Sequence, residues 1–148
     1  MNDIKLTDNG DLILGNPKTD SDGNIIIKDG KPILDLDIVS NTFCDKQMIY
    51  ERLMTEQLDW YIYENIGNKL NDLIGQPNTR TTGDLGVKYI TDALTYDQFI
   101  PINKISVKAT PINNNEIVFT VRIQLNENET YNAYVTLNLN KGVEINVD

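Results

Sequence analysis

The sequence of 148 residues contains no histidine and a single cysteine, Cys44. Without histidine the chain has no Ser-His or Cys-His catalytic pair, and it lacks the imidazole ligands that most transition-metal sites use. A single thiol closes no internal disulfide and is too few for a zinc site built from cysteines. Catalysis would therefore have to use carboxylates, lysine or tyrosine, and we expect neither a metal nor another cofactor.

Long apolar runs are also missing. No stretch of about 18 apolar residues is present, and a membrane-spanning helix needs one of that length. The first residues, MNDIKLTDNGD, lack the basic start and apolar stretch of a secretion signal. We expect an intracellular product, or one released by lysis, that does not bind membranes.

Positive charge is scarce as well. The chain has 13 Lys and Arg against 22 Asp and Glu, which gives a net charge of −9. Such a chain repels phosphate backbones, so we expect no nucleic-acid partner. The acidic excess favours solubility. With 40% hydrophobic residues the chain has enough apolar material for a core, and its length predicts a single domain over residues 1–148.

Residues 1–40 alternate short apolar runs with polar turn signals. Asn9-Gly10 and Asp22-Gly23 are dipeptides whose glycine supplies the positive φ that tight turns need. The segment DSDGNIIIKD resembles a calcium-binding loop, but it places Lys18 at the first ligand position, where the metal needs an oxygen donor. We therefore predict an extended arm or short strands over residues 1–40, with a β-turn at Asp-Gly-Asn.

The first predicted helix begins near Cys44. Ile49 and Leu53 stand four residues apart, and this spacing predicts a helix that continues to about Asp59. A residue at the start of this segment should cap the helix, and the candidates are Ser40, Asn41 and Thr42.

Two more helices complete the helical part, which we place at residues 42–97. A short one is predicted over residues 69–74, where the following Gly-Gln-Pro should stop it. The segment GQPNTRTTGDLG reads as an interhelix loop, within which Thr81 and Asp84 match the capping box of a third helix. The predicted apolar face of the third helix consists of Leu85, Tyr89, Ile90, Ala93 and Leu94.

The period changes to two in the last part of the chain, residues 102–147. Alternation of apolar and polar residues predicts antiparallel strands with one face against the helices, and PINNNE and NENE read as hairpin turns. VEINV should add a fourth strand. The predicted fold class is thus α+β, with two to three helices packed on a C-terminal meander. The apolar positions are Ile105, Val107, Ala109, Ile117, Phe119, Val121, Ile123, Leu125, Tyr131, Ala133, Val135, Leu137 and Leu139.

Acidic residues surround aromatic ones in residues 51–64, a composition that suits a carboxylate-based glycosidase. Such an enzyme needs two acids in different environments across a cleft. On a helix Glu51 and Glu56 diverge in direction, and the pattern favours the solvated face of an amphipathic helix. We interpret Trp60 and Tyr61 as a cover over the end of the core. A lysozyme-like hydrolase, or a carbohydrate-binding module that uses Trp60 and Tyr63, remains the alternative.

Three short motifs follow one another in an order typical of a known family. Leu6-Thr7-Asp8-Asn9-Gly10-Asp11-Leu12 matches LT-x-x-GDL. Arg52 to Trp60 match RL-x-T-x-x-x-(D/E)-(W/F), and Tyr63 to Leu70 match (Y/P)-x-x-x-G-x-x-L. A helix that closes on Ala93-Leu94 and a sheet-forming tail follow. In this order the chain resembles the sheath-initiator or baseplate wedge proteins of contractile phage tails, a family that includes W-like proteins and homologues from phage-tail-like bacteriocins.

The chain departs from that family pattern at a few places. A Glu-Pro-Arg or Asp-Pro-Arg triplet commonly follows the Ala-Leu helix in the family, whereas this chain has Asp97-Gln98-Phe99 and keeps only the acid. Leu58 stands where the family usually has a glycine before the acidic residue. Residues 17–32 resemble an insertion that lengthens the arm.

The resemblance implies assembly and no enzymatic activity. It implies a ring of several copies around the tail tube, which templates the first sheath disc and whose sheets are extended by sheath strands. The implied partners are the sheath protein and the wedge and tube-proximal proteins, and the implied location is the tail baseplate, after synthesis in the bacterial cytoplasm. An open meander has edge strands that can accept a partner strand. The candidate interface residues are Arg52, Asp59, Trp60, Tyr63, Gly67, Asp97 and Phe99.

Overall fold

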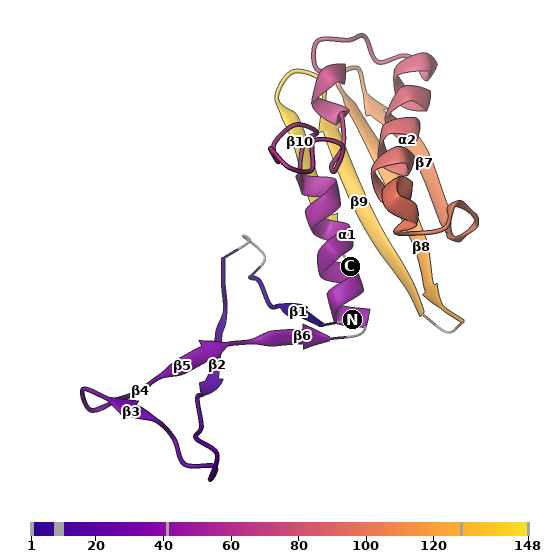
Figure 1. Cartoon of the computed structure of the whole chain (residues 1–148). Coiled ribbons are helices and arrows are strands. Elements are labelled where there is room, and N and C mark those ends of the chain that lie inside the picture. The colour runs from indigo at the N-terminus through magenta and orange to yellow at the C-terminus, as the bar shows by residue number, and fades with distance from the viewer. Residues whose placement is uncertain (1, 8–10, 41, 128, 148) are drawn as a thin grey trace. The chain divides into compact units, whose positions relative to one another are not determined.

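The computed structural model describes residues 2–7, 11–40, 42–127 and 129–147. The chain divides into two compact units, Met1–Gln47 and Met48–Asp148. Its fold is α+β, as predicted, with short N-terminal strands and two helices on a C-terminal antiparallel sheet (Figure 1). The expectation of one domain over the whole chain stays a prediction.

The first unit contains a set of nested strand pairs, which confirms the prediction of short strands. β1 (Asn2–Ile4) pairs with β6 (Ile38–Ser40), β2 (Leu14–Pro17) with β5 (Leu34–Leu36), and β3 (Ile27–Lys28) with β4 (Lys31–Pro32), all antiparallel. The innermost pair closes at Asp29 and Gly30, whose φ values are 52° and 74°. Two successive positive φ values are those of the hairpin turn that Asp-Gly favours.

Side chains hold the outer end of these nested pairs. Lys5 Nζ lies 3.0 Å from Asp37 Oδ2, and this contact lowers the pKa of the Asp37 carboxyl. Gln47 accepts a hydrogen bond from the N–H of Leu6 at 3.0 Å and donates one to the Ile4 carbonyl at 2.8 Å. A long-range set of polar contacts therefore supplements strand pairs that are individually too short to be stable.

Helix α1 (Thr42–Met54) ends well before Asp59, so the predicted end was wrong. The Asn68 side chain donates to the Leu53 and Thr55 carbonyls, and the Asn68 N–H also donates to Thr55. These carbonyls would otherwise accept the next bonds of the helix. Thr42 is already helical, whereas the candidate cap Asn41 lies outside the described residues.

Helix α2 (Arg80–Thr95) begins earlier than the sequence suggests. Its N-cap is Thr79, whose hydroxyl accepts a hydrogen bond from the Thr82 N–H at 3.3 Å. The predicted capping box of Thr81 and Asp84 was therefore wrong, as was the loop interpretation of the first two turns. A threonine at the cap satisfies the same free N–H groups.

Three short 3₁₀ helices accompany the longer ones. They are η1 (Leu70–Leu73), η2 (Tyr96–Gln98) and η3 (Ile102–Lys104). η1 confirms the predicted short helix, and Gly75 with a φ of 84° follows it. None of the helices among the described residues is long and apolar enough to cross a membrane.

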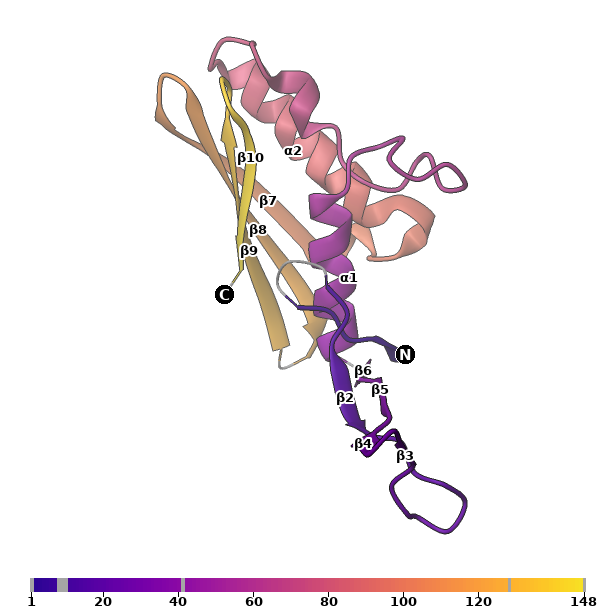
Figure 2. The ribbon, with the colours of Figure 1, turned by 90° about the vertical axis from the view of Figure 1, so that its left-hand side faces the viewer.

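The C-terminal sheet is an antiparallel meander. Its strands are β7 (Ile105–Asn113), β8 (Glu116–Asn126), β9 (Glu129–Asn138) and β10 (Gly142–Val147), in the order β10-β9-β8-β7. Figure 2 shows α2 and the second half of α1 on the same face of this sheet. Alternate residues of the central strands are buried, which confirms the predicted period of two.

One core unites the helices and the sheet. Predicted positions of the third helix are buried except Leu85, which is 38% exposed, and Tyr89, which is partly buried. Fully or nearly fully buried in this core are Ile49, Leu53, Leu70, Leu73, Ile90, Leu94, Ile100, Ile117, Phe119, Val121, Ile123, Tyr131, Ala133, Val135, Leu137 and Leu139.

Two glycines let α2 approach the sheet closely. A Cβ atom built on Gly86 would overlap the ring of Phe119, whereas a Cβ on Gly83 would meet only the Ala109 methyl at 3.4 Å. Glycine is costly in a helix interior, so its presence at position 86 reflects the space that Phe119 occupies.

These two glycines give a matched pair of variants. We expect Gly86→Ala to destabilise the protein by about 1–3 kcal/mol, because the methyl group overpacks the core. In contrast, we expect Gly83→Ala to be neutral or to stabilise it by up to about 1 kcal/mol through helix propensity. Chemical denaturation of both variants measures the difference, and equal stabilities would contradict the close approach at Gly86.

A second prediction concerns Tyr131, which is 2% exposed. Burial raises the pKa of Tyr131 to about 12, and Tyr50 adds to the shift. Between its unfolded pKa of about 10 and the folded value, the unfolded chain releases this proton while the folded protein keeps it, so stability falls as pH rises. We expect a loss of about 1–2 kcal/mol across this window.

Denaturation midpoints measured from about pH 9 to about pH 11.5 test this expectation, because this range begins below the unfolded pKa and covers most of the interval up to the folded one. The variant Tyr131→Phe removes the ionising group and should show a flatter pH dependence than the unmodified protein. Tyr61→Phe is the control, since Tyr61 is 92% exposed and should leave the dependence unchanged.

Candidate functional site

The acidic residues of the 51–64 segment do not converge. Glu56, Asp59 and Glu64 are exposed, and the Asp59 carboxylate accepts a hydrogen bond from the Glu56 N–H at 3.0 Å. That carboxylate stabilises its own loop. Within the described residues no cluster of three or more His, Cys, Asp or Glu side chains that could hold a metal ion is found.

The loop after α1 is shaped by Gly67 and Asn68. Gly67 has a φ of 111°, and a Cβ atom there would lie 2.5 Å from the Thr55 carbonyl oxygen. The Gln57 N–H donates to the Asn68 carbonyl at 3.0 Å. The predicted role of Gly67 in fixing a turn is therefore confirmed, because no other residue fits that close approach without strain. The contribution of Asn68 was missed.

The aromatic residues of this loop are exposed. Trp60 is 57% exposed, Tyr63 60% and Tyr61 92%. The expectation that Trp60 and Tyr61 cover the core was therefore wrong, because α1 ends at Met54 and the loop leaves the core surface. Together with α1 residues and Ile66, Trp60 and Tyr63 line a shallow hollow of about 260 Å³. Exposed aromatic residues that gather in this way are typical of an interaction surface.

Three of the candidate interface residues meet at the end of α2. The Arg52 guanidinium lies 4.3 Å from the centre of the Phe99 ring. It also donates to the carbonyls of Ala93 at 3.4 Å and Tyr96 at 3.2 Å. Burial lowers the pKa of Arg52, and the charge of Asp97 opposes that shift. Arg52 thus satisfies the free carbonyls of a helix end, where positive charge is stabilising.

The seven candidate residues therefore fall into two neighbouring groups. Arg52, Asp97 and Phe99 form a bridge between α1 and the end of α2, which we call the Arg52 bridge. Asp59, Trp60, Tyr63 and Gly67 belong to the loop after α1. Arg52 contributes to both, because it also lines the hollow beside Trp60.

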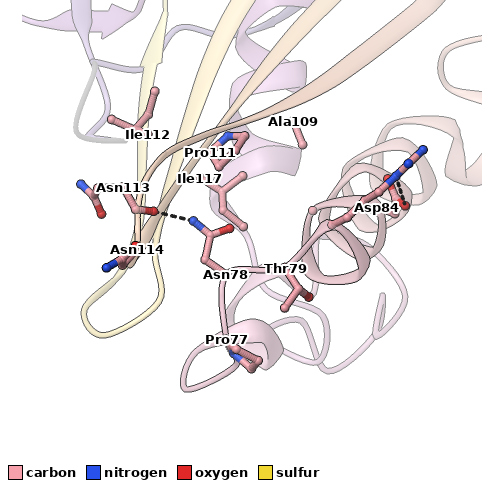
Figure 3. A pocket seen from close by; sticks show the side chains of 12 residues that line it. Pro77, Asn78, Thr79, Asp84, Ala109, Pro111, Ile112, Asn113, Asn114 and Ile117 are labelled. Atoms are coloured by element: carbon pink, nitrogen blue, oxygen red, sulfur yellow. Dashed lines mark hydrogen bonds and ion pairs between the residues drawn. The ribbon is translucent and has the colours of Figure 1, made fainter.

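A further hollow was not predicted. It has a volume of about 790 Å³ and lies between the start of α2 and the end of β7 (Figure 3). Asn78 Nδ2 spans it by donating to the Asn113 carbonyl at 2.6 Å. Gly83, Ala109 and Ile112 give it an apolar wall. In the sequence, Gly83 within a helical pattern was the feature that could have indicated this close approach of α2 to β7.

A second hollow of about 300 Å³ lies beside β10. Side chains from α1, the loop that follows it, the η1 region and β10 line it. The apolar ones are Leu53, Met54, Ile74, Val143 and Ile145, and the polar ones include Glu56, Asn68 and Lys141. Asn71 also lines this hollow, and its buried Oδ1 has no hydrogen-bond partner in the described part of the chain. Buried polar atoms usually have a hydrogen-bond partner, so this oxygen is an exception.

The calcium-like segment forms a turn, as predicted. Asp20 Oδ1 accepts hydrogen bonds from the N–H groups of Asp22 and Asn24, each at 2.9 Å. The bond from Asn24 is the main cause that lowers the pKa of Asp20. Gly23 follows with a φ of 85°, so the carboxylate is used in the way of an Asx turn.

No protein-family model, no curated protein and no solved structure matches this chain.

The Arg52 bridge gives a testable prediction. Arg52→Lys keeps the charge but loses the planar group that stacks on Phe99 and reaches two carbonyls, so we expect a loss of about 1–2 kcal/mol in unfolding free energy. Arg80→Lys is the control, because Arg80 is 95% exposed and lies 3.9 Å from Asp84. We expect that control to stay within about 0.5 kcal/mol of the unmodified protein. Equal losses would contradict a specific role for Arg52.

Proposed function

We propose that this protein is a structural baseplate component of a contractile phage tail or phage-tail-like particle. In this role it joins the wedge and the tube to the first sheath ring, and it templates sheath assembly by sharing strands. The observation that carries the proposal is an open antiparallel sheet whose outer strands, β7 and β10, each pair with one strand among the described residues. Such strands present unpaired backbone groups to a partner.

Backbone conformation at the family-like positions supports the proposal. Leu58 has a φ of 77°, the left-handed conformation that glycine adopts without strain. The resembled family usually has glycine at this position. A left-handed conformation at position 58 is one that a glycine would favour, and this supports the resemblance.

The altered triplet after α2 also has a structural account. Asp97 and Gln98 have φ values of 58° and 56°, and proline, whose φ is close to −65°, cannot occupy position 98 in this conformation. Phe99, in place of the family's arginine, receives the Arg52 guanidinium on its ring. The chain closes the end of α2 with Arg52 and Phe99.

The proposed partners are the sheath protein and the neighbouring wedge and tube-proximal proteins, with several copies in a ring. The proposed location is the tail baseplate. Exposed Trp60 and Tyr63, with the hollow beside them, suit contact with a neighbouring subunit. The same exposed rings favour the alternative of a carbohydrate-binding module.

The proposal predicts the phenotype of a particle-producing host that lacks this protein. We expect tail tubes without sheaths, because the first sheath disc would have no template, and we expect plasmid-borne protein to restore sheathed tails. Negative-stain electron microscopy of purified particles measures both outcomes. Normally sheathed, contractile tails in the absence of the protein would overturn the proposal.

A further inference from the structure

The direction of each backbone group on β10 follows from one hydrogen bond. The Leu139 N–H donates to the Asn115 carbonyl at 2.8 Å, which extends the register in which Leu137 lies opposite Ile117. The odd-numbered residues of β9 therefore direct their N–H and C=O groups toward β8, and the even-numbered ones toward β10.

The outer edge of β10 is consequently defined. Glu144 lies opposite Thr136 and pairs with it through hydrogen bonds, since even-numbered residues of β9 face β10. Val143 and Ile145 then direct their N–H and C=O groups away from the sheet. Their side chains point to the core side, where both are partly buried. This edge contains no proline and no lysine.

The outer edge of β7 differs. By the same alternation Val107, Ala109 and Pro111 direct their backbone groups outward. Pro111 has no N–H to offer, and Lys108 stands between two of these positions. Proline and lysine are the residues by which natural sheets protect an edge from pairing. Backbone chemistry thus distinguishes the two edges, and only β10 is left open along its length.

The hollow beside β10 lies on the core side of this edge. A strand added to β10 would run about 4.8 Å from it, and every second side chain of that strand would point toward the hollow. There it would meet Met54, which is 53% exposed, and Ile74, which is 40% exposed. These side chains would be covered by the added strand.

We infer that β10 is the edge that accepts the partner strand and that the hollow receives the alternate side chains of that strand. The inference rests on the proposed function and specifies its docking site. The occupant is an extended segment of a sheath subunit, with aliphatic residues at those alternate positions that meet Met54 and Ile74 and polar residues where it meets Glu56 and Lys141. On the other face, a lysine or arginine opposite Glu144 would complement its charge.

Two variants distinguish the edges. Met54→Lys places a charge in the hollow beside β10, and Ile112→Lys places the same charge in the hollow beside β7. Ile112 is 60% exposed, so both side chains are exposed and both variants should fold. The probe is the sheath subunit encoded with this protein, and binding is measured by titration of purified proteins. We expect Met54→Lys to weaken binding by about tenfold or more and Ile112→Lys to change it by less than about twofold.

Amide hydrogen exchange of the unmodified protein supplies a measurement that requires no variant. When the sheath subunit binds, we expect slower exchange at Val143 and Ile145 and unchanged exchange at Val107 and Ala109. Protection of the β7 amides, or a larger effect of Ile112→Lys, would overturn the inference and leave the proposed function intact. No binding of the sheath subunit by the unmodified protein would overturn the proposed function itself. Concentration-dependent protection of β10 in the protein alone would identify a second copy as the occupant and would also overturn the inference.

Discussion

The contact between the Phe119 ring and Gly86 limits how closely α2 can pack on the sheet, because only a residue without a Cβ atom fits there. At this distance α2 covers β7 and part of β8. The β10 side is left to α1 and η1, and η1 has four residues. A short element covers less apolar surface than a full helix, so the cover over β10 is incomplete. The hollow between Met54, Ile74 and Ile145 is the result.

The sheet was predictable because its signal is local. The alternation over Ile117 to Leu125 and Tyr131 to Leu139 predicts which side chains face the core. The structure buries those positions, Leu125 only in part. Helix ends were predicted less well, since they depend on contacts from elsewhere. Asn68 lies 15 residues after Leu53 in the sequence, and it ends α1 by donating hydrogen bonds to the Leu53 and Thr55 carbonyls. Periodicity contains no information about such a contact.

The candidate site shows the same division. The order of the motifs in the sequence identified Arg52, Asp97 and Phe99 as candidate interface residues. The structure places them in contact or close to one another. What Arg52 binds was not predictable, because its acceptors are backbone carbonyls, which every residue has. Gly67 was predictable as a turn residue. The exposure of Trp60 was not, because it follows from where α1 ends.

An unprotected edge strand is a liability, because it can also pair with another copy of the same chain. The remedies on β7, proline and lysine, would also prevent strand addition if they were present on β10. A net charge of −9 opposes association between copies without altering any backbone group on the edge. Glu144 and Asn146 add polarity on the face away from the core. Charge thus protects against self-association, while the open N–H and C=O groups of Val143 and Ile145 preserve the capacity to pair with a different chain.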